Sequence, residues 1–484
     1  MNQLAKILAL FVAKLILILL LLGGNALQAQ RKSTSVSVKD NGKTSISVNN
    51  GFGKNFHVEF QGDIKLSEDD SDVIAISSGG YMEIKRSAFG SRRRIFIEPD
   101  GSGHLVKKYY VGGSQKGFAG EGQKWLAEIL LDVVRTTTLG SEERVDRIYK
   151  KRGAYGVLKE VDFMDSDYVK SRYLKLLLKK NLNNPDVISV LNTIGSDMDS
   201  DYHKADILKN SFPQFSSTDT RLSAFINAVS EIDSDHHKAE VLKKTIKDGN
   251  IDENQMKSMF IITKDIDSDN HKSSVLLAAL GNYTLSENNV KLLASTSKSI
   301  DSDHHRAEVL KTAIYKANLP SGGLHTFLNA LEGMSSDHHI DDVLSNMVSD
   351  KTLEPSTISH VLKCVAYMDS DSHQANVLKK LVQSQKLSNT NVENLVLALN
   401  RINSDSHTAS VLKYVAELNL SGDQLLVIFD AIRRIDSDYH KAESLIRFAN
   451  KIGQSDSDLV DAYRSTSSSI NSDSHYRRAI NAIQ

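Results

Sequence analysis

Cysteine, tryptophan and strong net charge are almost absent from this chain of 484 residues. The one cysteine, Cys364, cannot form a disulfide within the chain, and its position in an apolar stripe predicts a small buried side chain. The formal net charge is −1, so no overall field attracts nucleic acid or an acidic membrane. Aromatic residues make up 6%, which suits thin helical layers better than one large core.

Common catalytic motifs are also absent. The sequence has no His-Glu-x-x-His zinc helix, no Gly-x-Ser-x-Gly elbow and no Gly-x-x-x-x-Gly-Lys phosphate loop. Ser295-Thr296-Ser297-Lys298 and Ser268-Asp269-Asn270 match two serine β-lactamase motifs, but in the wrong chain order. We therefore expect a protein that is not an enzyme. The alternative is a hydrolase or metal-dependent enzyme with an unrecognised site.

One motif is copied ten times in the last two thirds of the chain, most clearly at 300–311. Its second Asp, here called the marker Asp, recurs at 34-residue spacing seven times, then at 33 and 35. A fixed period of this length indicates a solenoid. Ser precedes the marker in every copy, and the ten pairs are Ser166-Asp167, Ser200-Asp201, Ser234-Asp235, Ser268-Asp269, Ser302-Asp303, Ser336-Asp337, Ser370-Asp371, Ser404-Asp405, Ser437-Asp438 and Ser472-Asp473.

Apolar spacing on both sides of the marker predicts two helices per repeat. Counting from the marker, apolar residues fall at −13, −10, −9 and −3, and again at +6 and +7, with a small residue usual at +4. The polar residues at −2 and −1 are suited to cap the second helix, and the sequence leaves open which of them does so. The marker Asp should then lie in the first turn, where negative charge suits the helix dipole.

Histidine occupies position +2 in nine copies, and position +1 is also His at 236, 304 and 338. Equivalent residues in adjacent helical layers are about 10 Å apart, too far to share an ion. We therefore expect no metal and no cofactor, with each His bonded to a nearby Ser or Asp. The turns also lack the Gly and Glu of a calcium loop. Lys or Arg at +3, balanced by acids such as Glu240 and Glu308, predicts a solvated face without nucleic-acid binding.

The chain begins with a pattern typical of a secretory signal peptide over residues 1–29. Lys6 precedes an apolar run, and small residues follow it, which predicts cleavage after Ala26 or Ala29. An uncleaved anchor is the alternative, although Lys14 interrupts the apolar run. Contact with a membrane is expected only through such an uncleaved segment.

Residues 31–112 predict a small antiparallel β domain. The alternating runs 35–39 and 45–49 flank Asp40-Asn41-Gly42, a hairpin signal, and further strands are expected at 55–61, 73–77, 81–86, 93–98 and 104–110. Arg92-Arg93-Arg94 is interpreted as a solvated edge that discourages aggregation, with anion binding as the alternative. Residues 113–150 are expected to form a helical connector or cap, and 151–484 the repeat domain.

The repeat length resembles that of tetratricopeptide repeats, but the Trp, Leu-Gly and Tyr signature of those repeats is missing. The array looks like a divergent tetratricopeptide or HEAT-like solenoid. Its Ser-Asp-x-His-Lys motif also resembles uncharacterised exported repeat proteins of Bacteroidetes-type bacteria. In these, such repeats can accompany membrane zinc-peptidase sensors of the β-lactam-signalling type. This resemblance implies a role in envelope sensing, and no catalytic residue carries over because the zinc helix is absent.

The expected fold is mainly α: a right-handed α-solenoid of about ten 34-residue helix-turn-helix repeats, preceded by the small β domain. The expected function is that of an exported scaffold or adaptor, periplasmic or extracellular, that binds a protein or peptide partner. The sequence leaves the partner and the oligomeric state open. Candidate partner-binding residues on the first helices, which vary between copies, are Lys257, Lys291, His325, Ser359 and Asn394.

Export gives the first testable prediction. The mature protein should begin near Leu27 or Gln30 and lie outside the cytoplasm, because the small residues before these positions suit signal peptidase. N-terminal sequencing of the fractionated protein measures this directly. Recovery of the chain in a membrane fraction with Met1 retained would contradict cleavage.

Overall fold

The computed structural model describes residues 33–38, 43–49, 55–88, 91–248, 251–316, 321–453 and 456–483. The expected signal segment and the Asp40-Asn41-Gly42 turn lie outside these residues. The chain forms two compact units, residues 1–203 (unit 1) and 204–484 (unit 2). Among the helices of the described residues, none combines the length and the apolar run that crossing a membrane requires.

Unit 1 contains antiparallel strands where the alternating pattern predicts them. The strands are β1 (Ser33–Val38), β2 (Thr44–Asn49), β3 (Asn55–Gln61), β4 (Ile64–Leu66), β5 (Val73–Ile76), β6 (Tyr81–Ala88), β7 (Ser91–Pro99), β8 (Leu105–Val111) and β9 (Ser114–Lys116). Seven form one sheet in the order β1-β2-β3-β6-β7-β8-β9, while β4 pairs with β5. The strands missed by sequence, β4 and β9, have three residues each, too few to show alternation.

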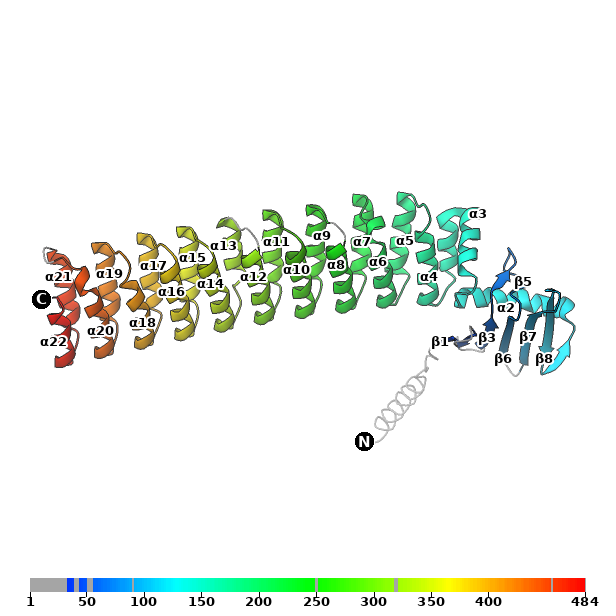
Figure 1. Cartoon of the computed structure of the whole chain (residues 1–484), viewed down its shortest axis with the longest axis horizontal. Helices are drawn as coiled ribbons and strands as arrows, with labels where there is room; N and C mark the ends of the chain where they lie inside the picture. The colour runs from blue at the N-terminus through cyan, green and yellow to red at the C-terminus, as the bar shows by residue number, and fades with distance from the viewer. Residues whose placement is uncertain are drawn as a thin grey trace, which may run out of the picture. The chain divides into compact units, whose positions relative to one another are not determined.

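The helix α2 (Gln123–Thr136) supplies the other half of the sheet's core (Figure 1). Its buried stripe, including Trp125 and Ile129, belongs to one cluster with the sheet residues Ile84, Ile95 and Tyr109. Burying each large apolar side chain contributes roughly 1.5–3 kcal/mol. The apolar residues of α2 are therefore part of the core of the β domain.

The arginine run 92–94 does not lie on an edge strand. It belongs to β7, which pairs with β6 on one side and β8 on the other. The interpretation of these arginines as a protective edge is wrong, because both sides of β7 already have hydrogen-bonded neighbours.

Helices occupy most of the described residues after the sheet and make the protein mainly α, as predicted. They are α3 (Ser141–Val161), α4 (Asp167–Leu178), α5 (Asn184–Ser196), α6 (Asp201–Phe215), α7 (Asp219–Ser230), α8 (Asp235–Asp248), α9 (Glu253–Lys264), α10 (Asp269–Asn282), α11 (Glu287–Ser297), α12 (Asp303–Lys316), α13 (Ser321–Asn329), α14 (Asp337–Asp350), α15 (Pro355–Ala366), α16 (Asp371–Ser384), α17 (Asn389–Leu399), α18 (Asp405–Val415), α19 (Gly422–Arg433), α20 (Asp438–Phe448), α21 (Ser457–Ser467) and α22 (Asp473–Asn481). Non-helical backbone at Gly153, with φ 64°, interrupts α3 close to the predicted boundary between the connector (113–150) and the repeat domain (151–484).

A buried ion cluster in unit 1 joins the β4–β5 hairpin to α3 and α4. Arg144, 3% exposed, donates hydrogen bonds to Asp70 at 2.6 Å, to Glu160 at 2.8 Å and to the Tyr173 hydroxyl at 3.0 Å. Removing one partner would leave a buried charge uncompensated, so the three elements depend on one another.

The helices of unit 2 pack in two layers (Figure 1). From α8 onward each even-numbered helix packs beside the next even-numbered one, and the odd-numbered helices do the same from α7. The apolar positions expected from the repeat are buried, as Val309, Leu310 and Ile314 of α12 illustrate. Each hairpin therefore buries its apolar stripe against its neighbours.

Every second helix of a repeat begins at its marker Asp, from α4 at Asp167 to α22 at Asp473. The Ser before it holds the N-cap position, which settles the choice between −2 and −1, as at Ser404 and Ser437. In these two copies the hydroxyl accepts the backbone N–H of the His at +2, at 3.5 and 3.4 Å. These bonds are long, so the Ser caps contribute modestly.

The carboxylate of the marker Asp reaches the turn of the next repeat. Asp303 Oδ2 accepts the backbone N–H groups of Ser335 at 2.9 Å and Ser336 at 2.7 Å. The same contact, here called the aspartate tie, joins Asp371 to the N–H of Ser404 at 2.8 Å. It also starts from Asp167, Asp235, Asp269, Asp337, Asp405 and Asp438. The marker is therefore a contact between repeats, beyond the dipole role predicted for it.

The basic residue at +3 makes a second contact between repeats. Lys204 Nζ donates to the carbonyl of Glu231 at 2.7 Å, and Lys272 Nζ to that of Ser299 at 2.8 Å. Both carbonyls lie at the end of the next first helix, where the dipole favours a cation. These lysines are 6% exposed, so the prediction of a solvated face is wrong at +3.

The aspartate tie predicts a larger loss of stability from Asp303→Asn than from Ser302→Ala. Asn keeps the side-chain size but removes the charge, and hydrogen bonds to charged groups contribute about 1.5–3 kcal/mol. We expect the free energy of unfolding to fall by about 2 kcal/mol, against less than about 1 kcal/mol for Ser302→Ala. Urea unfolding, with hydrogen exchange at the amides of Ser335 and Ser336, measures the difference. A larger loss from Ser302→Ala would contradict the tie.

The same tie predicts a dependence on pH. Burial raises the pKa of Asp303, but hydrogen bonds from Ser335 and Ser336 outweigh it, so this pKa lies below its usual value. A lowered folded pKa gives stability that is present above the unfolded pKa and is lost as pH falls through the folded pKa. The gap in unfolding free energy between wild type and Asp303→Asn should hold at neutral pH and narrow below about pH 4. A gap that widens on acidification would contradict this account.

Candidate functional site

Within unit 2, the histidines at +2 form a row along the N-terminal ends of the second helices. All nine histidines at +2 in the chain are half-buried, while the side chain at +1 beside each of them is exposed. The marker Asp fixes this arrangement, because it sets where each helix begins. The row is therefore a regular surface feature with accessible ring edges.

Rings at +1 connect the row from one repeat to the next. His304 lies 5.2 Å from His305 and 5.6 Å from His339 of the following copy, measured between ring centroids. His338 continues the series to His339 at 5.1 Å and to His373 at 5.7 Å. The expected separation of about 10 Å concerns equivalent positions, whereas a +1 ring and the next +2 ring are neighbours. The doubled histidines could have indicated this from sequence.

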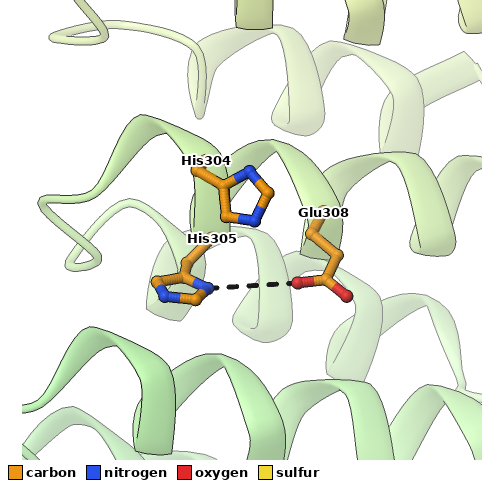
Figure 2. Close-up of side chains that lie close together, drawn as sticks. All are labelled: His304, His305 and Glu308. Carbon is orange, nitrogen blue, oxygen red and sulfur yellow. Dashed lines mark ion pairs between the residues drawn. The ribbon is translucent and has the colours of Figure 1, made fainter.

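Three side chains of α12 approach one another closely enough to bind one ion. Ligand atoms of His304, His305 and Glu308 all lie within 4.8 Å of one another. Figure 2 shows the two imidazoles and the carboxylate projecting from this helix, with an ion pair of 4.0 Å between His305 Nδ1 and Glu308 Oε2. The Glu308 side chain is 50% exposed, so the group is open to solvent.

Hydrogen bonding along the row differs from the expected pattern. His373 Nδ1 lies 2.8 Å from Asp341 Oδ2 of the preceding repeat, which is the kind of partner predicted. His305 Nδ1, in contrast, is buried without a hydrogen-bond partner. Burial, together with neighbouring His338 and His304, lowers the pKa of His339, which favours a neutral imidazole there. Neutral imidazole is the form that binds metal.

The predicted partner-binding residues lie on successive first helices, from α9 to α17. Lys257 and Lys291 are exposed, and Lys291 forms an ion pair of 2.6 Å with Glu287 on its own helix. His325, Ser359 and Asn394 are half-buried. Asn394 Nδ2 donates to Ser359 Oγ at 3.1 Å, so the structure brings these two together across a repeat boundary. The lysines remain available to a partner.

A cavity of about 420 Å³ lies beside Ile340, which replaces the basic residue at +3 in the copy of Asp337. Apolar Leu328 and Met334 line it together with His360, Cys364 and other polar groups. Burial raises the pKa of Cys364 to about 11, so its thiol is protonated at neutral pH. The repeat pattern of the sequence did not predict this cavity.

A second hollow, of about 400 Å³, lies on the sheet of unit 1 and is lined mainly by basic residues. Lys85 stands opposite Arg94 across β6 and β7, and Arg86 stands opposite Arg93. Like charges directly opposite one another are unfavourable, and Glu83 offsets part of this with an ion pair of 3.4 Å to Arg94. The hollow suits an anionic group, which is the alternative that the sequence left open for residues 92–94.

Comparison with known proteins leaves these sites to be interpreted from their own chemistry. A scan of protein-family models found no match to the chain, and a search of curated proteins found none either.

Proposed function

We propose that the chain is an exported scaffold that binds a protein or peptide partner through the first helices of its repeats and catalyses nothing. The observation that carries this proposal is a division of roles within the repeat. Positions shared by the copies make contacts between repeats, whereas positions −12 and −8 of several first helices face solvent and differ from copy to copy.

The solvent-facing positions combine charge with apolar surface. Residues at −12 and −8 lie four apart, so they share one face of a helix. Lys257 is followed by Ile261 on α9, which is 50% exposed, and Glu393 by Leu397 on α17, which is 64% exposed. Exposed apolar side chains set among charges are suited to recognition of another polypeptide. Solenoids generally use such extended surfaces for binding.

The alternative of a hydrolase receives less support from the residues. In the cavity beside Ile340, Cys364 is the available nucleophile, but its raised pKa disfavours the reactive thiolate. His360 in the same cavity has a pKa lowered by burial and by neighbouring His325 and Lys363. These groups fit a binding pocket better than nucleophilic catalysis.

The cellular setting of the scaffold is proposed from the first residues and the repeat motif. A signal-like segment predicts export, and the motif resembles that of exported proteins linked to envelope sensing. An adaptor in the envelope that presents one partner to another is consistent with a long repeat surface.

The surface role can be tested by charge reversal at Lys257 and Lys291. We expect Lys257→Glu with Lys291→Glu to weaken capture of an envelope partner by about tenfold or more, because two favourable charges become repulsive. The matched control is Lys247→Glu with Lys316→Glu, which makes the same charge change at exposed positions of second helices. Capture is measured by quantitative pull-down from envelope extract.

Helical circular dichroism should be unchanged in both double variants, because all four lysines are exposed. The melting temperature should fall only slightly when Lys291→Glu replaces the exposed ion pair with Glu287 by a like-charge pair. Equal capture by the two double variants would contradict a role for the first helices. Hydrolase turnover by the purified chain, abolished by one substitution, would contradict the scaffold proposal itself.

A further inference from the structure

We propose that His304, His305 and Glu308 of α12 bind a divalent transition-metal ion, with zinc the best match to the donors. This site is separate from the proposed partner-binding surface on the first helices. Its starting observation is geometric: the three ligand atoms already lie within 4.8 Å of one another on one rigid helix. Figure 2 shows all three side chains directed toward a common region.

The spacing needs only small side-chain movements to accept an ion. Zinc–nitrogen and zinc–oxygen bonds of about 2.0–2.2 Å place neighbouring tetrahedral ligands roughly 3.4 Å apart. His305 Nδ1 and Glu308 Oε2 are 4.0 Å apart, so modest rotations bring them to this separation. Two imidazoles and one carboxylate favour zinc and its neighbours over magnesium or calcium, which prefer oxygen donors.

The partner of Glu308 distinguishes this copy from two others, because its ion-pair partner is an imidazole, whereas Glu240 and Asp342 each pair with a lysine. His-His-x-x-acid also occurs in the copies of Asp235 and Asp337. In the first of these, Glu240 pairs with Lys243 at 3.1 Å. In the copy of Asp303, the equivalent lysine, Lys311, turns instead to Asp342 of the next repeat. Lys311 is thereby withdrawn from Glu308.

Two further facts support occupancy at α12. His305 Nδ1 is buried and lacks a hydrogen-bond partner, a costly arrangement that a metal ion would relieve. Glu308 has His305 as its ion-pair partner among the described residues. The ring of His339 lies 5.6 Å from that of His304, between centroids, but His339 is not part of the three-residue group, so water would supply the fourth ligand.

The full-length chain, stripped with a chelator, can be titrated with Zn²⁺ alone at pH 7 by isothermal calorimetry. We expect one site removed by His305→Ala and weakened about tenfold or more by Glu308→Gln, which keeps the side-chain size. The matched controls are His237→Ala and Glu240→Gln in the copy of Asp235, and these should bind as the wild type does. Cobalt substitution should give the visible absorption of a four-coordinate site, absent in His305→Ala.

Circular dichroism of each variant checks that the chain remains folded. Failure to bind Zn²⁺ at about 100 μM, a concentration well above the dissociation constant of a typical zinc site, would overturn the proposal. Unchanged binding in Glu308→Gln, or equal losses in the control variants, would overturn it as well, because the ion would then be held elsewhere on the histidine row. Partner capture is measured without added metal, so failure of this proposal is distinguishable from failure of the scaffold proposal.

Discussion

The hydrogen bonds from each repeat's turn to the marker Asp of the preceding repeat are the contacts on which unit 2 depends. Apolar burial between layers supplies most of the stabilisation, but it is not directional and leaves the register of adjacent hairpins loosely specified. Asp303, through Ser335 and Ser336, fixes that register at the start of a helix. Lys272, through the carbonyl of Ser299, fixes it at the end of the neighbouring helix. Where +3 is lysine, as in the copies of Asp201, Asp269 and Asp438, a cation at the helix end thus complements the aspartate at the helix start.

This fixed register also creates the histidine row. Because every second helix begins at its marker, a ring at +1 can lie beside the +2 ring of the next copy, as His236 does beside His271 and Tyr439 beside His475. His304 therefore contacts His339, and His338 contacts His373, without any further sequence change. The histidine row thus follows from the aspartate tie. A substitution at +1 alone can extend or interrupt the ring contacts between repeats.

The features predicted correctly from sequence are those carried by local or periodic patterns. Helix spacing, the alternating strands and the position of the marker Asp in the first turn of each second helix all follow from patterns within a few residues. The partner of Asp303 lies 33 residues away at Ser336, and Arg144 meets Asp70 across 74 residues, distances at which a single sequence gives no signal. The basic residue at +3 was misjudged because charge usually means exposure, whereas a helix end can satisfy a buried cation. Glu308 is left to the histidines because Lys311 pairs with Asp342 and not with Glu308. The spacing of these residues in the sequence does not indicate which of the two acids the lysine contacts.

Regularity itself explains where the candidate sites lie. A helical repeat that makes all its contacts with its neighbours leaves few unpaired polar groups and few cavities. Binding sites are therefore expected where one of these contacts is lost or made with a different partner. In the copy of Asp303, Lys311 is redirected to Asp342 and leaves Glu308 to the imidazoles. In the copy of Asp337, Ile340 stands where other copies have the basic residue at +3, and a cavity lies beside it. Both departures fall in consecutive copies, so the stretch from α12 to α15 combines an open donor group with an open pocket. Because α12 packs on α14, a ligand at either place acts on the same run of helices.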